Sequence, residues 1–263
     1  MVQYTRYGSH MVKGDLGWTS HYDKPVIEVL HFRLKWTLVL LLPAVTVSVS
    51  IGAGGLLGLL AGWRSGKRAD RILMAPLLLL HSVPAYRLGS LFLLLLSIHA
   101  PFFPSGGMES SPLSGLTGLA DVLHHMVLPF STLFLCGAAS HFLVMRSAVR
   151  RVSSEDYVLM ALSLGLSDRK VLFRHMPPNS LQPLVNMAAL EFGSMVGAAL
   201  LVEMVFSWQG MGTLIHDAVL ACDHPLLSGC LLLLTLCAIA ANGLAYLACA
   251  AVDPRVRDGT ADV

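Results

Sequence analysis

The sequence predicts an all-α protein that crosses a membrane several times. Of its 263 residues, 55% are hydrophobic and only 13% are charged, and the mean hydropathy is +0.67. A soluble domain of this length cannot bury so much apolar surface. A net charge of +2 is also too small to indicate nucleic acid as a partner. We therefore expect the chain to lie in a bilayer, in contact with membrane lipid rather than with nucleic acid.

Five stretches are long enough to cross a bilayer as helices, which requires about 20 apolar residues for a hydrocarbon core of about 30 Å. These predicted spans are Leu38–Gly62, Ile72–Ala100, His125–Met145, Leu181–Phe206 and Leu226–Val252. Pro84 interrupts the second stretch. Because no polar cluster separates its two halves, we expect one kinked span there rather than two short helices.

The positions of lysine and arginine predict the orientation. Four lie in the connection 63–71, six in the loop 146–175 and two in the tail 254–263, whereas the connections 101–124 and 207–225 contain none. Positive residues favour the cytoplasmic side of a membrane. The sequence therefore predicts a cytoplasmic C-terminus and places the N-terminal segment outside.

The N-terminal segment 1–35 fits that orientation poorly. It is polar, carries five lysine and arginine residues, and has no apolar core of a signal peptide. We expect either a further span upstream of Met1 or a charged tail that is inserted as it stands. The predicted organisation is an external segment 1–35, a transmembrane domain 36–253 and a cytoplasmic tail 254–263.

Residues 146–180, called the charged loop below, form the one strongly charged connection between spans. Ser153 and Asp156 have the spacing of a capping box, which predicts the start of a helix. Four apolar residues then follow at helical spacing and predict one apolar stripe. These residues are Tyr157, Met160, Ala161 and Leu164.

A turn and a second helix complete the predicted loop. Gly165 suits the left-handed residue that ends a helix. Ser167 is a candidate N-cap for the second helix, while Arg174 and His175 complement its C-terminal end. Pro177 and the proline after it should stop it. The sequence therefore predicts a helix–turn–helix between two membrane spans that binds another protein.

Two other interpretations of the charged loop are weaker. A DNA-reading helix must reach the major groove, normally from a compact soluble domain, and both ends of this loop are tethered to the bilayer. A solvated connection without any partner is the second alternative, and it remains open.

The sequence contains no pattern typical of catalysis or of a metal site. The five cysteines lack CxxC spacing and the histidines are scattered, so we predict no metal ligands. The stretch Gly62–Arg68 is too short between its glycines for a phosphate-binding loop and has no Ser or Thr after Lys67. We expect no catalytic residues and no cofactor in this chain.

Three residues within the apolar stretches, Pro84, Arg87 and Glu203, are candidates for a membrane path. Arg87 follows Pro84 in the second span, and a cation there is expensive unless it faces water or a partner. Arg87 would line a path for a solute, pair with Glu203 or Glu191, or extend to the interface. For Glu203 we favour a structural or gating role over contact with a solute.

The charged loop also resembles a known family. The run DYVLMALSLGLSDRKVLFRHMPPN (156–179) resembles the cytoplasmic coupling loop of the membrane subunits of ABC importers, in the form found in dipeptide, oligopeptide and nickel permeases. Five further stretches resemble that family in the same order, so the resemblance covers nearly the whole chain. They are Gly14–Leu38, His81–Gly89, Val202–Gly212, Asp217–Gly229 and Asp253–Arg257.

The resemblance implies a function. The chain would be a permease subunit in a bacterial or archaeal cytoplasmic membrane, forming the path for peptides or nickel chelates that a solute-binding protein delivers. A second permease subunit would complete the path, and two ATPase subunits would bind ATP and magnesium. The residues that the resemblance assigns to ATPase coupling are Asp156, Tyr157, Ala161, Gly165, Leu166, Ser167, Arg174 and His175.

The chain also departs from the family pattern. Members usually have six spans, so the resemblance implies that the first is missing here, and the letters EAA are reduced to Leu159-Met160-Ala161. Pro177 replaces a helix-forming residue. An alternative from another class is a membrane-anchored scaffold or regulatory protein that binds a partner through the charged loop without transport.

Overall fold

The computed structural model describes residues 14–50, 56–110 and 116–252 as a helical bundle with one small hairpin. The hairpin pairs strands β1 (Trp18–Thr19) and β2 (Lys24–Pro25) in antiparallel register. The helices of the first half are α2 (Val26–Ser50), α3 (Gly58–Trp63), α4 (Arg68–Ser82), α5 (Ala85–Phe92) and the π-helical η2 (Leu93–His99). Those of the second half are α6 (Leu116–Val152), α7 (Asp156–Ser163), α8 (Asp168–Lys170), the π-helical η3 (Val171–His175), α9 (Pro177–Ser180), α10 (Gln182–Val205), α11 (Met211–Leu220) and α12 (His224–Val252).

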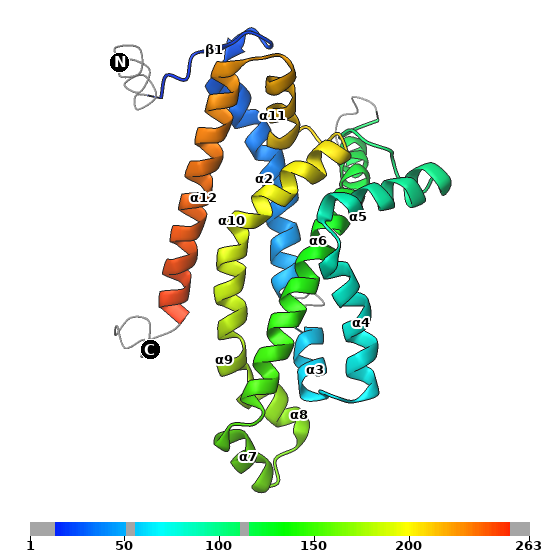
Figure 1. Ribbon diagram of the computed structural model, residues 1–263, viewed down its shortest axis with the longest axis vertical. Coiled ribbons are helices and arrows are strands. Elements are labelled where there is room, and N and C mark those ends of the chain that lie inside the picture. The colour runs from blue at the N-terminus through cyan, green and yellow to red at the C-terminus, as the bar shows by residue number, and fades with distance from the viewer. Residues whose placement is uncertain (1–13, 51–55, 111–115, 253–263) are drawn as a thin grey trace.

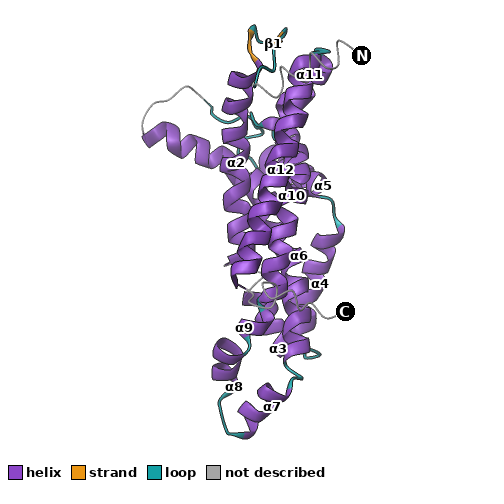
Figure 2. Ribbon diagram, turned by 90° about the vertical axis from the view of Figure 1, so that its left-hand side faces the viewer, coloured by secondary structure: helices purple, strands orange, loops and turns teal. Residues whose placement is uncertain are grey.

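The long helices run along one axis and give the molecule an elongated shape (Figures 1 and 2). The hairpin and α11 lie at one end, called the hairpin end, and α7 and α8 lie at the other, called the loop end. Among the described residues, Val26–Val49, Thr117–Val152 and His224–Leu244 are each long and apolar enough to cross a membrane. The all-helical, multi-pass fold class is confirmed.

The first predicted span differs from the structure in its bounds. Helix α2 begins at Val26 rather than Leu38 and ends at Ser50, and α3 is a separate helix. Two glycines bring α3 against α6, because a Cβ on Gly58 would lie 2.7 Å from the Cβ of Met145 and one on Gly62 2.7 Å from the Cβ of Val149. Small residues four apart allow such close helix contact in a membrane.

The second predicted span consists of two helices with a sharp bend between them, which is compatible with one broken span or with a re-entrant loop. Asp70–Ser82 and Ala85–His99 are bent by 102° at the break between them. Proline disfavours helical backbone in the residue before it, and Val83 is accordingly extended, with φ −96° and ψ 123°. Helix α4 therefore runs along the bundle, whereas α5 and η2 turn across it and project from its side (Figure 1).

Asp223 attaches the hairpin to the rest of the bundle. One of its carboxylate oxygens accepts the backbone N–H groups of Ser20 (2.7 Å) and His21 (3.2 Å), and the other accepts the N–H of Leu226 (3.1 Å) at the start of α12. Burial alone would raise the pKa of Asp223, but hydrogen bonds from the Thr19 hydroxyl and these N–H groups outweigh it, and the pKa lies below its ordinary value.

We expect this attachment to depend on pH. Because the pKa of Asp223 is lower in the folded state, its ionised form stabilises the fold above the ordinary pKa of about 4, and that contribution is lost as pH falls through the folded-state pKa. The protection factors of the Ser20 and His21 amides, which compare measured hydrogen exchange with the intrinsic rate at the same pH, should therefore fall on acidification in the wild type. In Asp223→Ala they should already be low at neutral pH, and equal protection in both proteins would contradict the assignment.

Candidate functional site

The charged loop folds as two short helices at the loop end, but its first helix does not begin as predicted. Helix α6 continues to Val152, and the Ser153 hydroxyl donates to the carbonyl of Arg150 (2.8 Å) rather than capping α7. Glu155 holds the N-cap position without a side-chain hydrogen bond, and Asp156 is exposed in the first turn of α7. The predicted capping box is therefore wrong.

The predicted turn at Gly165 is confirmed. Its φ is +80°, the left-handed conformation that glycine adopts without strain. The N–H of Gly165 donates to the carbonyl of Leu162 (3.0 Å), and the N–H of Leu166 donates to that of Ala161 (3.2 Å). This pair of bonds is the Schellman pattern of a helix end. Ser167 holds the N-cap position of α8, without a side-chain hydrogen bond.

Helix α7 has two apolar faces rather than the one predicted. Its inner face, including Val158 and Ala161, packs with buried residues of η3 and the end of α6. Tyr157 belongs to this side, and its hydroxyl accepts a hydrogen bond from the Asn179 side chain (3.0 Å). The outer face exposes Leu159 (53%), Met160 (65%) and Leu164 (71%). The predicted stripe is thus divided between the bundle and the surface.

The second half of the loop returns to the bundle through η3. Val171 and Leu172 are buried there, while Arg174 is exposed and His175 is half-buried. The helix ends at His175, two residues before Pro177, near the stop that the two prolines predict. Pro177 then begins α9, which suits a residue with no N–H to donate.

An ion pair with a buried carboxylate fixes the last part of α6 to the first turn of α4. The Arg146 guanidinium contacts both oxygens of Asp70, with Nε to Oδ1 at 2.6 Å and Nη2 to Oδ2 at 2.7 Å. Asp70 is 2% exposed and also accepts the N–H of Gly66 (2.9 Å). Sequence reasoning missed this pair, because no local spacing links residues 76 positions apart.

The structure does not bring the three membrane-path candidates together. Arg87 is exposed, one turn after Pro84, and its guanidinium lies 5.9 Å from the ring centre of Tyr86. Among the described residues, it forms no ion pair with Glu203 or any other carboxylate. The side chain of Glu191, the other predicted partner, lies outside the described part of the structure.

Glu203 belongs to a closed turn at the end of α10. It is 0% exposed and accepts the N–H of Gly212 (2.6 Å). Gly210 lies against the same carboxylate, where a Cβ would have no room. Trp208 donates its indole N–H to the carbonyl of Trp36 (3.2 Å) and ties this turn to α2. This geometry favours the structural role for Glu203.

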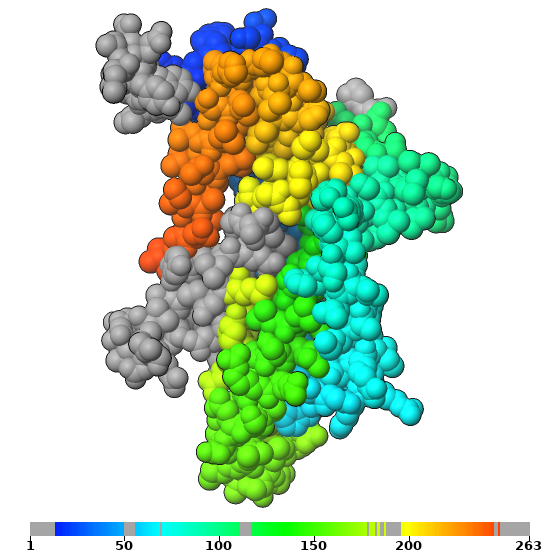
Figure 3. All heavy atoms as spheres, in the orientation of Figure 1, coloured from blue at the N-terminus to red at the C-terminus, as the bar shows by residue number. Residues whose placement is uncertain are grey.

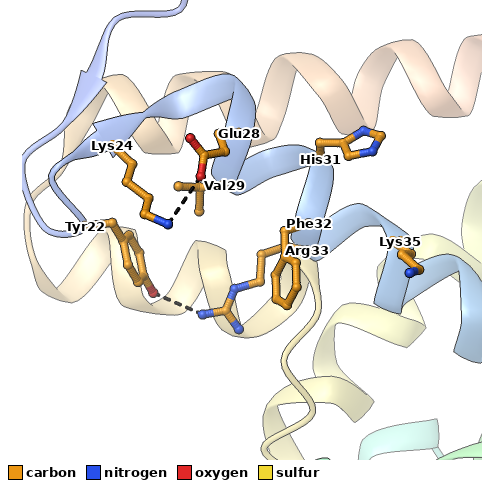
Figure 4. A pocket seen from close by; sticks show the side chains of 8 residues that line it. All are labelled: Tyr22, Lys24, Glu28, Val29, His31, Phe32, Arg33 and Lys35. Atoms are coloured by element: carbon orange, nitrogen blue, oxygen red, sulfur yellow. Dashed lines mark hydrogen bonds and ion pairs between the residues drawn. The ribbon is translucent and has the colours of Figure 1, made fainter.

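A hollow of about 560 Å³ lies at the hairpin end, along α2 (Figure 4). Its lysine and arginine side chains already have partners. Lys24 pairs with Glu28 at 3.2 Å, Arg33 donates to the Tyr22 hydroxyl at 3.3 Å, and the Lys35 ammonium lies 5.8 Å from the centre of the Trp36 ring. Within the described residues, no three metal-ligating side chains lie close enough together to hold an ion. The charged loop, with its exposed apolar face, is therefore the strongest candidate site.

Comparisons with known proteins agree on one family. The model of the binding-protein-dependent transport system inner membrane component matches residues 54–258. A probable peptide ABC transporter permease of Sinorhizobium fredii is 31% identical over 97% of this chain and 80% of its own length. The oligopeptide transport permease AppB of Bacillus subtilis is 30% identical over 97% and 80%, and the glutathione transport permease GsiC of Salmonella paratyphi A is 32% identical over 97% and 79%.

Solved structures show the same fold at lower identity. A chain of the inward-facing MetNI methionine ABC transporter superposes with a TM-score of 0.66 at 16% identity, covering 88% of this chain and 99% of the other. A chain of an amino acid ABC transporter has a TM-score of 0.59, also at 16% identity, covering 84% and 92%.

Proposed function

The chain belongs to the family of binding-protein-dependent transport system inner membrane components and is a permease subunit of an ABC importer, and from this premise we propose that it transports peptides and is driven through α7. The family is a transport family, and the ATPase is a separate subunit. The solute, the partner subunits and the residues that bind the ATPase are therefore what we propose below.

The observation that carries the proposal is the outer face of α7. Leu159, Met160 and Leu164 are all more than half exposed, on a helix whose inner face is packed against the bundle. Burying such side chains is worth about 1.5–3 kcal/mol each. An apolar helix face of this kind fits a groove on a partner protein. We assign that groove to the ATPase.

The packing beneath α7 supports a mechanical role for the loop. Val158 and Ala161 contact one cluster that also contains Val171 and Met176 from the second half of the loop and Val149 from α6. Helix α6 then continues through the bundle as one helix of 37 residues. A push on α7 would therefore move α6 as a rigid body, as alternating access requires.

The relatives support a peptide as the solute. Those named above are a peptide, an oligopeptide and a glutathione permease, and no nickel permease is among them. The decisive measurement is stimulation of ATP hydrolysis by the assembled importer with short peptides and, separately, with nickel chelates. We expect the peptides to stimulate hydrolysis, and stimulation by nickel chelates alone would contradict this assignment.

The remaining partners and the orientation follow from the family and the charge distribution. We assign a second permease subunit, two ATPase subunits and a solute-binding protein to the complex. The loop end lies in the cytoplasm, because the cations of the connection 63–71 and of the charged loop gather there. Arg87, exposed beside Tyr86, stays a candidate for the solute path.

Gly165→Pro should uncouple ATP hydrolysis from uptake. Proline fixes φ near −65°, whereas Gly165 has φ +80°, and proline also removes the N–H that donates to Leu162. We expect the turn to open at a cost of about 3 kcal/mol or more, with the subunit still inserted. Uptake and ATP hydrolysis in proteoliposomes measure the result.

Gly107→Pro is the matched control. Gly107 has φ +86° and donates its N–H to the carbonyl of Phe206 (3.0 Å), and a Cβ on either glycine would have no neighbouring atom within 4 Å. The control therefore imposes the same backbone conflict far from the charged loop. Normal uptake by Gly165→Pro, or equal uncoupling by both variants, would count against the role of the loop.

A further inference from the structure

A second hollow, of about 400 Å³, lies between the α3–α4 turn and the second half of the charged loop. Three cations and one carboxylate border it, from Arg64, Lys67, Arg169 and Asp168. Two aromatic side chains complete this part of the lining, Trp63 at the end of α3 and Phe173 in η3. The hollow thus joins a turn between membrane helices to the loop that receives the ATPase.

The cations of this hollow are available to a ligand. Within the described residues, the side chains of Arg64, Lys67 and Arg169 form no hydrogen bond or ion pair. Asp70, the buried carboxylate nearby in sequence, already accepts both contacts of Arg146. Asp168 alone offsets the three cations, so the hollow carries an excess of positive charge and suits an anion.

The hollow lies where a membrane surface is expected. It lies at the end of α3 and the turn that leads into α4, and α4 exposes Ile72 (72%) and Leu79 (71%), which are apolar side chains suited to lipid. The space-filling view shows α4 forming the outer edge of the molecule beside the charged loop (Figure 3). Helix α7 lies beyond α8 and α3, farther from the bundle (Figure 2).

Aromatic and basic side chains together are typical of a headgroup site. Tryptophan favours the interface between hydrocarbon and water, and Trp63 is half-buried at this turn. Each arginine or lysine near an anionic membrane surface contributes about 1 kcal/mol of attraction. A partner protein would instead reach α7, whose exposed face is apolar rather than basic.

We propose that this hollow binds the headgroup of an anionic phospholipid and that the bound lipid fastens the α3–α4 turn to α8 and η3. The phosphate lies among Arg64, Lys67 and Arg169, and the acyl chains follow the apolar side of α4. The loop is then held against the membrane domain, so that movement of α7 reaches α6 instead of bending the loop. The inference goes beyond the proposed function and depends on it only for the choice of the cytoplasmic leaflet.

Native mass spectrometry of the complete importer with phosphatidylglycerol tests binding without requiring transport. The triple variant Arg64→Gln, Lys67→Gln, Arg169→Gln removes the three cations of the hollow. Arg68→Gln with Arg71→Gln is the matched control, because both cations belong to the start of α4 and neither lines the hollow. We expect the triple variant to bind this lipid on the order of a hundredfold more weakly, and the control to retain it.

ATP hydrolysis by the importer in nanodiscs then tests whether the bound lipid supports coupling. In the wild type, phosphatidylglycerol added to phosphatidylcholine should raise solute-stimulated ATP hydrolysis, whereas inorganic phosphate in neutral nanodiscs should not. The triple variant should give the neutral-lipid rate in both. Three results would overturn the proposal. The triple variant could retain phosphatidylglycerol, the control could lose it equally, or inorganic phosphate could stimulate ATP hydrolysis fully. Loss of the ATPase subunits from the triple variant with lipid still bound would also overturn it.

Discussion

Met160→Asp combined with Leu164→Asp should abolish uptake while leaving the subunit inserted in the membrane. Both side chains are exposed, at 65% and 71%, so the substitutions leave the packed inner face of α7 intact. Apolar anchors at the centre of an interface are worth about 2 kcal/mol or more each. Binding of the ATPase should therefore weaken on the order of a thousandfold. Co-purification of the ATPase with the permease and uptake in proteoliposomes measure the effect.

Ser153→Asp with Ser154→Asp is the control for the added charge. These serines lie in the turn between α6 and α7, off the apolar outer face, and their hydroxyls bond only to carbonyls of the preceding turn (2.8 Å each). We expect this variant to retain the ATPase and most uptake. Retention of the ATPase by the Met160 and Leu164 variant would exclude α7 as its docking surface.

Arg146→Ala should destabilise the loop end strongly. The substitution leaves the Asp70 carboxylate, which is 2% exposed, without the guanidinium that contacts both its oxygens. Removing one partner of a buried ion pair typically costs about 3–5 kcal/mol. For a domain of this size the melting temperature should fall on the order of 10 °C. Thermal unfolding of the purified subunit in detergent gives the measurement.

Two further variants separate the ion pair from a general loss of charge. Arg150→Ala removes an exposed cation one turn later on α6 and should melt close to the wild type. Adding Asp70→Asn to Arg146→Ala removes the unpaired charge while an amide oxygen can still accept the N–H of Gly66, so part of the stability should return. A melting temperature for Arg146→Ala equal to that of Arg150→Ala would show that the pair contributes little.

The parts of the fold predicted correctly depend on local chemistry. The apolar stretches predicted membrane helices because helix length and hydropathy are properties of one segment. Gly165 was predicted as a left-handed turn because few other residues adopt that conformation, and the structure confirms it with φ +80°. The family resemblance also rested on local runs of sequence, and the comparisons confirm it.

The wrong predictions concern features that tertiary contacts determine. The spacing of residues in α7 predicts a stripe but not its partner, and the structure divides the stripe between Ala161 on the inside and Met160 and Leu164 on the outside. The predicted capping box failed because α6 continues to Val152 before the turn. The break before Pro84 needed the direction in which α5 packs, which no window of sequence contains.

The site is less predictable than the fold for the same reason. The ion pair of Asp70 with Arg146 and the hollow beside Arg64 and Arg169 each join segments far apart in the sequence. Charge counts had placed these residues at the same end of the bundle, but they could not indicate which cation has a carboxylate partner and which is free. That distinction requires the packing of α3 against α6.

Photo-crosslinking from α7 tests the central claim that its outer face receives the ATPase. Benzoylphenylalanine replaces Met160 in one variant and Leu119, which is 57% exposed near the start of α6, in the matched control. On irradiation of the assembled importer, we predict a covalent adduct between the ATPase and position 160 and none with position 119. An ATPase adduct at position 119, or its absence at position 160 in a complex that hydrolyses ATP and imports solute, would contradict the account.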